Sequence, residues 1–167
     1  ILVTKEHLKD FKAQAVIINS GNANTCTGDT GIKNAEEMCS SCGNLLNLNG
    51  SDVLVASTGV IGVQLDIDTI KGTVPNLVKS LSKEGYIDST KAIMTTDTVP
   101  KTVALKLQLG GKTVTIGAMT KGSGMIHPNM ATMLCFITTD ANISPELLYK
   151  ALKESVKISY NRISVDR

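Results

Sequence analysis

The sequence is poor in aromatic and charged residues and has no tryptophan. Its 167 residues include three tyrosines, two phenylalanines and four prolines, and charged residues make up 19%. A chain of this length buries roughly two-thirds of its unfolded surface on folding, so it can form a core. With so few aromatic residues, that core must be aliphatic. Hydrophobic residues make up 42%, which is typical of a globular protein and not of a disordered one.

The sequence also lacks clusters of basic residues and long apolar runs, which argues against nucleic acids and membranes as partners. The 17 basic and 15 acidic residues are scattered, so no cluster of lysines and arginines is available for a row of phosphates. No apolar run reaches the roughly 18 residues that span a bilayer, and the opening Ile1-Leu2-Val3 is too short for the apolar region of a signal peptide. We therefore expect no nucleic-acid partner, no membrane segment and a soluble, cytoplasmic protein.

Cysteine is also scarce, and its spacing argues against a metal site. Of the four cysteines only Cys39 and Cys42 form a Cys-x-x-Cys pair, within a stretch that otherwise has helical periodicity. A structural zinc site needs two further ligands with similar spacing, and His7 and His127 are isolated. Reduced thiols in a cytosolic protein, without a metal, are the favoured interpretation.

What the chain does contain is an alternation of strand-like and helix-like segments. Short apolar runs predict strands, at residues 15–18, 53–56 and, as a buried strand, 133–137. Apolar residues at helical spacing predict helices, at 31–46, at 66–81 and after the capping sequence Ser144-Pro145-Glu146. Pro75 should kink or divide the second helix. This alternation favours an α/β fold with mixed sheets and packed helices, and residues 1–167 are treated as a single region because no linker is visible.

Alternating apolar residues on both sides of Gly110-Gly111 predict a two-residue β-hairpin. The adjoining Gly111-Lys112-Thr113 has a superficial likeness to a phosphate-binding loop. However, Lys106 occupies the position of the first required glycine, and a strand instead of a helix is expected to follow. We therefore expect no nucleotide site at this turn.

Three stretches rich in glycine and small polar residues carry a more specific signal. The longest runs from Lys121 to Leu134 (KGSGMIHPNMATML) and is followed by FITTDA; the other two are NSGNAN at 19–24, with CTG after it, and VASTGVIG at 55–62. In this order and spacing they resemble the ornithine acetyltransferase family. Similarity at residues 92–98 and 160–166 extends the resemblance across essentially the whole chain.

The resemblance implies an N-terminal-nucleophile-like enzyme that processes itself. The family's precursor is cut between the residues that match Ala131 and Thr132, and the resulting α and β chains assemble, by expectation into a heterotetramer. The enzyme moves an acetyl group from N-acetylornithine to glutamate in arginine biosynthesis, through an acetylated threonine and without a cofactor. Some members also use acetyl-CoA as a donor.

Cleavage explains how Thr132 could act as the nucleophile. A threonine hydroxyl is essentially never ionised near neutral pH and needs a base beside it. Hydrolysis after Ala131 would free the α-amine of Thr132, whose reference pKa of about 7.7 to 8.0 suits it to accept the hydroxyl proton. By the same resemblance, Thr58 and Gly59 match the oxyanion-hole pair, one offering its hydroxyl or N–H and the other its N–H. Judged by the residues alone, a glycine turn with a capping threonine is preferred there.

Lys121 and Thr95 match substrate-binding residues of the family, and the lysine charge could hold a carboxylate of N-acetylornithine or glutamate. A slip of one residue would put Thr96 in place of Thr95. Judged alone, a lysine beside a glycine loop is more often simply solvated. His127 invites a role as a base, but the family does not require it, and an exposed loop residue is the better interpretation.

The family pattern continues beyond Arg167. A later glutamate near the nucleophile, and an asparagine and a hydroxyl residue near the carboxyl end, have no counterpart in this sequence, and the family's amino-terminal segment is missing too. We therefore expect a piece of a longer protein, with little transferase activity as an isolated fragment. Two alternatives remain: an inactive truncated fragment with a structural or assembly role, and an N-terminal-nucleophile amidase or aminopeptidase.

Overall fold

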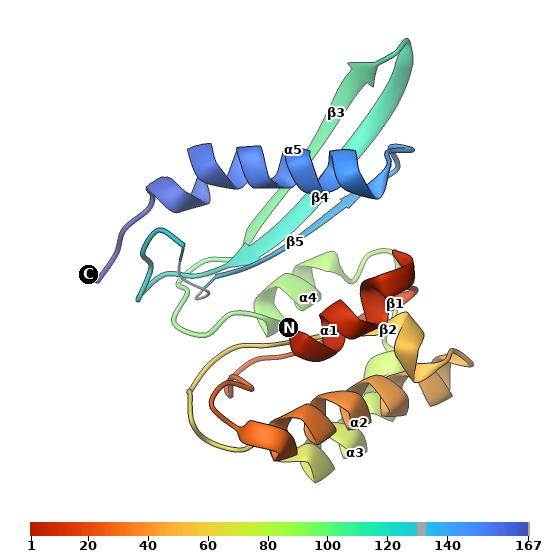
Figure 1. Cartoon of the computed structure of the whole chain (residues 1–167), viewed down its shortest axis with the longest axis vertical. Coiled ribbons are helices and arrows are strands. Elements are labelled where there is room, and N and C mark those ends of the chain that lie inside the picture. The colour runs from red at the N-terminus through yellow and green to blue at the C-terminus, as the bar shows by residue number, and fades with distance from the viewer. Residues whose placement is uncertain (130–132, 167) are drawn as a thin grey trace. The chain divides into compact units, whose positions relative to one another are not determined.

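The computed structural model describes residues 1–129 and 133–166. The chain divides into two compact units, Ile1–Gly85 and Tyr86–Arg167 (Figure 1). From the sequence we expect a single region without an internal boundary. The junction after Gly85 is marked by neither a change in composition nor a flexible linker. Each unit has its own sheet and its own helices, so they are described separately.

The first unit combines helices with a two-stranded parallel sheet. In chain order it contains α1 (Leu2–His7), a 3-10 turn (Leu8–Asp10), β1 (Ala15–Asn19), α2 (Gly28–Leu46), a 3-10 turn (Gly50–Asp52), β2 (Val53–Ser57) and α3 (Ile67–Lys79). The strands pair from Ala15 opposite Val53 to Asn19 opposite Ser57. The strands predicted at 15–18 and 53–56 are therefore confirmed, and so is the helix predicted at 31–46, which begins three residues earlier.

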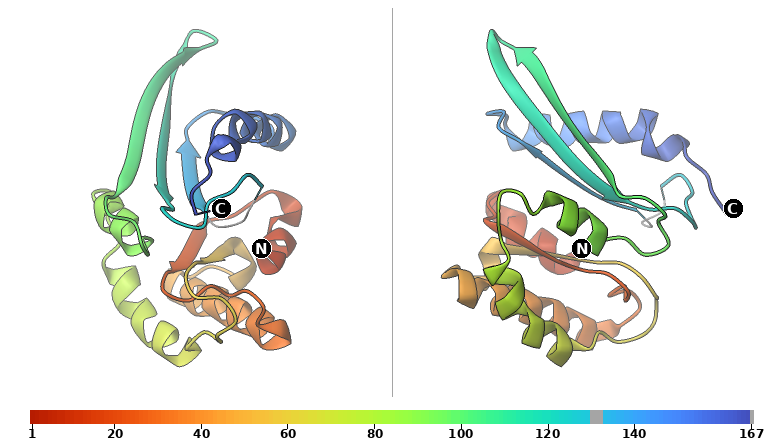
Figure 2. Two further views of the ribbon diagram at one scale, coloured as in Figure 1. Left: turned by 90° about the vertical axis from the view of Figure 1, so that its left-hand side faces the viewer. Right: turned by 180° about the vertical axis from the view of Figure 1, so that it is seen from behind.

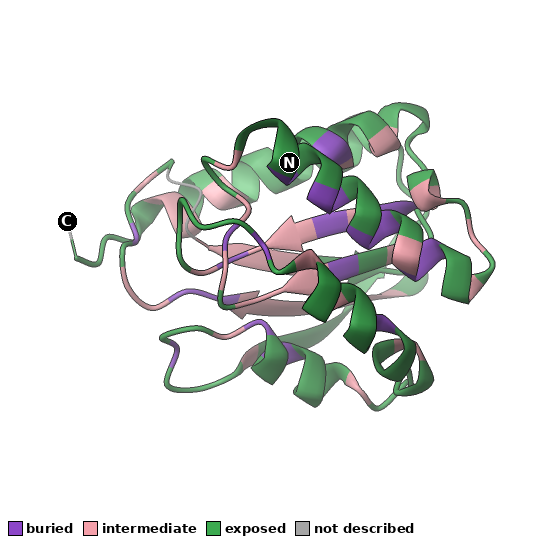
Figure 3. Cartoon of the chain, turned by 90° about the horizontal axis from the view of Figure 1, so that it is seen from below, coloured by how far each residue is buried: buried purple, intermediate pink, exposed green. Residues whose placement is uncertain are grey.

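The core of the first unit lies where α2 faces the two strands and α3. Met38 on α2, Val53 on β2 and Val74 on α3 are almost inaccessible to solvent, and Figure 3 shows the buried positions along α2 and the strands. Full burial of such side chains contributes about 1.5 to 3 kcal/mol each, so the apolar stripe of α2 holds this unit together. Helices α2 and α3 lie side by side in both views of Figure 2.

Pro75 does not divide the helix predicted at 66–81. α3 runs without interruption through Pro75, and the Asp66 side chain caps it by accepting a hydrogen bond from the Thr69 N–H. The apolar residues on either side of the proline, Ile70 and Val78, pack against the same core. Burial of this shared face offsets the one backbone hydrogen bond that a proline cannot make.

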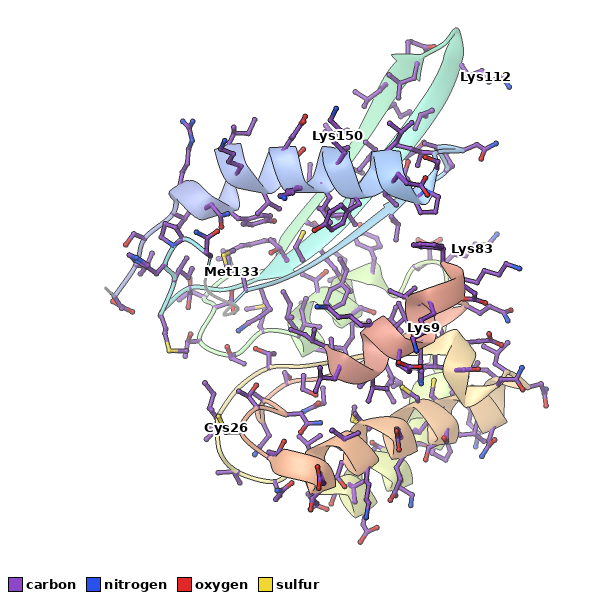
Figure 4. All side chains as sticks on the ribbon, in the orientation of Figure 1. Lys9, Cys26, Lys83, Lys112, Met133 and Lys150 are labelled. Carbon is purple, nitrogen blue, oxygen red and sulfur yellow. The ribbon has the colours of Figure 1, made fainter. Side chains whose placement is uncertain are left out.

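The second unit is built on a three-stranded antiparallel sheet in the order β3-β4-β5. Its elements are α4 (Tyr86–Ala92), β3 (Lys101–Leu109), β4 (Lys112–Lys121), β5 (Leu134–Thr139), α5 (Pro145–Ile158) and a 3-10 turn (Tyr160–Arg162). The predicted hairpin is confirmed: Leu109 faces Lys112, and Gly110 and Gly111 have φ of 56° and 76°. Positive φ at both central residues is what a tight hairpin requires. Figure 4 labels Lys112 near the tip of this hairpin.

The last strand and helix are present as predicted, but the strand is not buried. Leu134, Cys135 and Phe136 are only half-buried and Ile137 is 49% exposed. In the described sheet β5 is an edge strand that pairs with β4. α5 begins after Ser144, whose hydroxyl accepts from the Leu147 N–H, so its predicted cap is confirmed. No helix in the described part of the chain is long and apolar enough to cross a bilayer.

Candidate functional site

The carboxyl ends of β1 and β2 bring two of the glycine-rich stretches together. Because the strands are parallel, the stretch after Asn19 and the stretch after Ser57 leave the same edge of the sheet. Their pairing continues beyond the strands: Thr58 N–H donates to Asn19 O at 3.1 Å, and Val60 N–H donates to Gly21 O at 3.0 Å. Thr58 and Gly59 therefore lie at the end of a strand, in a loop fixed by backbone hydrogen bonds.

Gly59 cannot carry a side chain in this loop. Its φ is 131°, and a Cβ atom built on it would lie 2.2 Å from the backbone carbonyl of Gly21 and 2.7 Å from Asn22 N. Distances this short mean that the backbone itself would have to move. The glycine is required by the close approach of the two loops, and its N–H group is held in a defined direction as a result.

The hydrogen bonds around Thr58 and Gly59 indicate which groups could bind an oxyanion. The Thr58 N–H is already bonded to Asn19 O, so a donor from Thr58 to a developing negative charge would be its hydroxyl. The Gly59 N–H bonds to none of the residues that the structure describes. A hydroxyl and a backbone N–H are both donor types that can stabilise a developing oxyanion, and Thr58 and Gly59 have one of each.

A second cluster lies in the other unit, where the loop after α4 meets the end of β4. Lys121, the last residue of β4, is only 5% exposed, and its Nζ donates to Thr95 Oγ1 at 2.8 Å. Thr95 itself is exposed. The neighbouring Thr96 has a different partner, since its hydroxyl lies 2.8 Å from Ser123 Oγ. Of the two threonines considered from the sequence, Thr95 is therefore the one in contact with Lys121.

Asp97 completes this cluster and was not singled out from the sequence. One carboxylate oxygen accepts from the Gly122 N–H at 2.7 Å and from Lys101 Nζ, and the other accepts from the Thr95 N–H at 3.3 Å. Burial raises the pKa of the Asp97 carboxyl, but these three hydrogen bonds outweigh it and hold the pKa below its ordinary value. The sequence signals for Asp97 are its place two residues after Thr95 and its position within the family-like stretch 92–98.

The segment that leads toward Ala131 and Thr132, residues 122–129, is tied to residues 160–166 farther along the chain. Ile126 and Val165 exchange two backbone hydrogen bonds of 2.9 and 2.7 Å. Gly122 has a φ of 146°, and a Cβ there would lie 2.8 Å from Met133 Cγ. The start of the segment therefore lies against the side chain that follows Thr132, which Figure 4 labels before β5.

The predicted nucleophile and cleavage site, Thr132 and Ala131, lie outside the described residues. The other predicted residues form two pairs: Thr58 and Gly59 in the first unit, and Thr95 and Lys121 in the second. His127 is exposed, as expected for a loop residue. Within the described ranges, no group of three histidine, cysteine or acidic residues could hold a metal ion.

A cavity of about 260 Å³ lies between β5 and α5. Its walls are mainly apolar and include Cys135, Ile137, Leu152 and Tyr160. The Tyr160 hydroxyl donates to Cys135 Sγ at 3.2 Å, and burial together with this contact raises the pKa of the tyrosine. Neither pair of predicted site residues lines this cavity, so its chemistry differs from that of the candidate site.

Comparison with known proteins gives one consistent result. The family model described as the ArgJ family matches residues 1–167. The chain is 49% identical over 166 residues to the arginine biosynthesis bifunctional protein ArgJ of Symbiobacterium thermophilum, covering 99% of this chain and 41% of the relative. It is 52% identical over 167 residues to ArgJ 1 of Clostridium acetobutylicum, covering 100% of this chain and again 41% of the relative. The chain thus spans about two-fifths of the length of these curated relatives.

Two solved structures are similar as well. The chain aligns with the arginine biosynthesis bifunctional protein ArgJ of Bacillus halodurans with a TM-score of 0.70 and 42% identity, over 78% of this chain and 69% of that one. It aligns with the ornithine acetyltransferase of Mycobacterium tuberculosis, solved in complex with ornithine, with a TM-score of 0.70 and 36% identity over the same shares. The mixed α/β fold expected from the sequence is confirmed by this agreement.

Proposed function

The chain belongs to the ArgJ family, the ornithine acetyltransferases, and on that premise we propose that it provides part of an enzyme of arginine biosynthesis. This enzyme moves the acetyl group of N-acetylornithine to glutamate, with Thr132 as the nucleophile. The Mycobacterium tuberculosis structure with bound ornithine supports the substrate class. Support for the site comes from the two pairs of residues described above, each of which has the chemistry that one part of this reaction needs.

The first step is the maturation of Thr132. Its hydroxyl attacks the carbonyl of Ala131, the acyl group moves from nitrogen to oxygen, and water hydrolyses the ester. This frees the Ala131 carboxylate and the α-amine of Thr132. In each later turnover the α-amine takes the proton of the attacking hydroxyl, so that one residue is both nucleophile and base.

Acetyl transfer then follows in two halves. The Thr132 oxygen attacks the acetyl carbon of N-acetylornithine, and the proton held by the α-amine passes to the departing ornithine nitrogen. The α-amine of glutamate attacks the resulting acetyl ester, its proton passes through the Thr132 α-amine back to the Thr132 oxygen, and N-acetylglutamate leaves. In both halves, negative charge develops on the acetyl oxygen, where the Thr58 hydroxyl and the Gly59 N–H would donate.

The observation that carries the proposal is the hydrogen bond between Lys121 and Thr95. A buried ammonium group is costly unless polar partners surround it, and Thr95 supplies one at 2.8 Å. Lys121 also begins the stretch that leads through Gly122 to Thr132. A cation held in this place suits the carboxylate that N-acetylornithine and glutamate have in common.

Four finer features belong to the same proposal. Cleavage yields an α and a β chain that remain associated, in a heterotetramer, and the enzyme works in the cytoplasm. No cofactor takes part, and acetyl-CoA serves as a second acetyl donor at the same threonine. Addition of acetyl-CoA and glutamate without N-acetylornithine tests that last feature, because N-acetylglutamate forms only if acetyl-CoA is a donor.

The test of the proposal measures N-acetylglutamate formed from N-acetylornithine and glutamate by the complete gene product that contains residues 1–167. Lys121→Met keeps the apolar stem and removes the charge, and we expect the KM for glutamate to rise about tenfold to a hundredfold. Lys83→Met, at an exposed lysine, is the matched control and should leave the KM unchanged. Hydrolysis of small peptides without acetyl transfer would indicate an amidase instead. The absence of both activities would indicate a structural role.

A further inference from the structure

Asp97 has the most complete set of contacts of any acidic side chain in the described part of the second unit. Its side chain is fully inaccessible to solvent, whereas that of its ion-pair partner Lys101 is 38% exposed. Besides Lys101 it binds two backbone N–H groups, those of Thr95 and Gly122. A carboxylate that is buried with three donors is a fixed point in the structure, since removing any of them leaves a buried polar group unsatisfied.

The two backbone donors have a specific relationship to the candidate site. One belongs to Thr95, and the other belongs to the residue immediately after Lys121. Thr95 and Lys121 are the two residues whose side chains meet at 2.8 Å. A single carboxylate therefore connects the backbone on both sides of that contact, one from the loop after α4 and one from the end of β4.

We propose that Asp97 is a positioning residue for substrate binding, which sets the distance and orientation between the Thr95 hydroxyl and the Lys121 ammonium. The inference rests on the proposed function, because it takes these two groups as the ones that hold the substrate. Asp97 acts through them and does not itself touch the substrate. Its Gly122 contact also fixes the start of residues 122–129, the segment leading to Thr132.

The chemistry of the contact requires a carboxylate and not merely a polar side chain. Both oxygens of Asp97 act as acceptors. An asparagine has one oxygen and one NH₂ group, so either orientation places that NH₂ against a donor: the Thr95 N–H in one case, Gly122 N–H and Lys101 in the other. Asp97→Asn is therefore nearly equal in size but cannot satisfy both loops at once.

The experiment uses the complete gene product and compares steady-state constants for acetyl transfer. We expect Asp97→Asn to raise the KM for both substrates by about tenfold to a hundredfold, since hydrogen bonds to a charged group contribute that much, and to lower kcat less than KM rises. Asp88→Asn makes the same exchange at an exposed position on α4 and should change neither constant. Lys101→Gln retains a donor without the charge and should raise the KM less than Asp97→Asn does.

The results separate positioning from a purely structural role. An unchanged KM in Asp97→Asn overturns the inference, and so does an equal KM rise in Lys101→Gln, which would indicate charge pairing alone. A loss of kcat with unchanged KM, together with a lower melting temperature, would indicate support of the fold only. If the wild-type protein lacks acetyl transfer, the proposed function fails, and the Asp97 contacts can still be tested separately.

That separate test is amide hydrogen exchange of the wild-type protein, which needs no variant. We expect the Thr95 and Gly122 amides to exchange more slowly than the Thr98 amide at neutral pH. They should lose protection together as the pH falls below 3.8, the ordinary pKa of an aspartate, because protonation weakens both hydrogen bonds. Rapid exchange at Gly122 under neutral conditions would overturn the assignment of Asp97 as the fixed point.

Discussion

Asn129 and Asn161 form a reciprocal pair across the expected cleavage point. The Asn129 N–H donates to Asn161 Oδ1 at 3.1 Å, and Asn161 Nδ2 donates back to Asn129 Oδ1 at 2.9 Å. Asn129 lies two residues before Ala131, whereas Asn161 lies in the part of the chain that follows Thr132. The pair therefore connects the two segments that cleavage would separate.

This pairing predicts that Asn161→Ala slows self-cleavage. Both hydrogen bonds are lost, at about 0.5 to 1.5 kcal/mol each, so we expect the rate to fall about tenfold, measured as the appearance of the two fragments by intact mass. Asn161→Asp retains an acceptor for the Asn129 N–H, so its cleavage rate should lie between those of the wild type and Asn161→Ala. Asn142→Ala, at an exposed asparagine, is the control. Cleavage of Asn161→Ala at the wild-type rate would show that this pair does not orient the segment.

Gly59→Ala should destabilise the first unit more than Gly62→Ala does. Both glycines have positive φ, 131° and 82°, so both substitutions carry the cost of an unfavourable backbone, about 1 to 3 kcal/mol. Only at Gly59 does the added methyl group also overlap the backbone of Gly21, while at Gly62 it meets open space. The urea midpoint of each variant measures the difference. Equal midpoints would mean that the two loops do not lie as close together as described.

Thr58→Val tests the hydroxyl as an oxyanion donor. The substitution preserves the branched shape and removes the donor, and we expect kcat to fall about a hundredfold to a thousandfold. Thr58→Ser retains the hydroxyl and should keep most of the activity. The readout is acetyl transfer by the mature enzyme, with maturation confirmed by intact mass so that slow cleavage is not mistaken for slow transfer. A Thr58→Val variant as active as Thr58→Ser would exclude the hydroxyl from this role.

Three of the four free cysteines, Cys26, Cys39 and Cys42, should react with a maleimide in a defined order. Burial, followed by the nearby Cys42 and Glu36, raises the pKa of Cys39 to about 11, and burial also raises that of Cys42. At pH 8 both thiols are protonated and inaccessible, so the exposed Cys26 should be modified first. Cys39 and Cys42 should react only after unfolding in urea, followed by mass. Modification of Cys39 as fast as Cys26 would contradict the packing of α2.

The sequence was most informative where local chemistry decides the structure. The hairpin at Gly110-Gly111 and the cap at Ser144 follow from backbone conformation and side-chain hydrogen bonding within a few residues, and both are confirmed. The short helices α1 and α4 were not predicted, because six or seven residues give too little periodicity. The exposure of β5 and the continuity of α3 depend on neighbouring elements, which a local pattern does not contain.

In the candidate site, too, some residues were predicted from the sequence and others became apparent only in the structure. The pair Thr58 and Gly59 was proposed from the resemblance, and the parallel pairing of β1 with β2 supplies the physical reason for the glycine. Asp97 was missed because nothing in a single sequence distinguishes a carboxylate that turns inward from one that faces solvent. Only the structure shows that the backbone N–H groups of residues 95 and 122, far apart in the chain, both donate to the Asp97 carboxylate.

The most direct test of the central proposal is a peptide map of the complete gene product after brief incubation with N-acetylornithine and rapid acid quenching. We expect a new chain that begins at Thr132 and carries one acetyl group on the Thr132 side chain. This acetyl group should disappear on addition of glutamate as N-acetylglutamate forms. Thr132→Ala should remain uncut and unlabelled. Acetyl transfer by a protein in which Thr132 stays within an uncut chain, or carries no acetyl group, would contradict the proposed role of Thr132 as nucleophile.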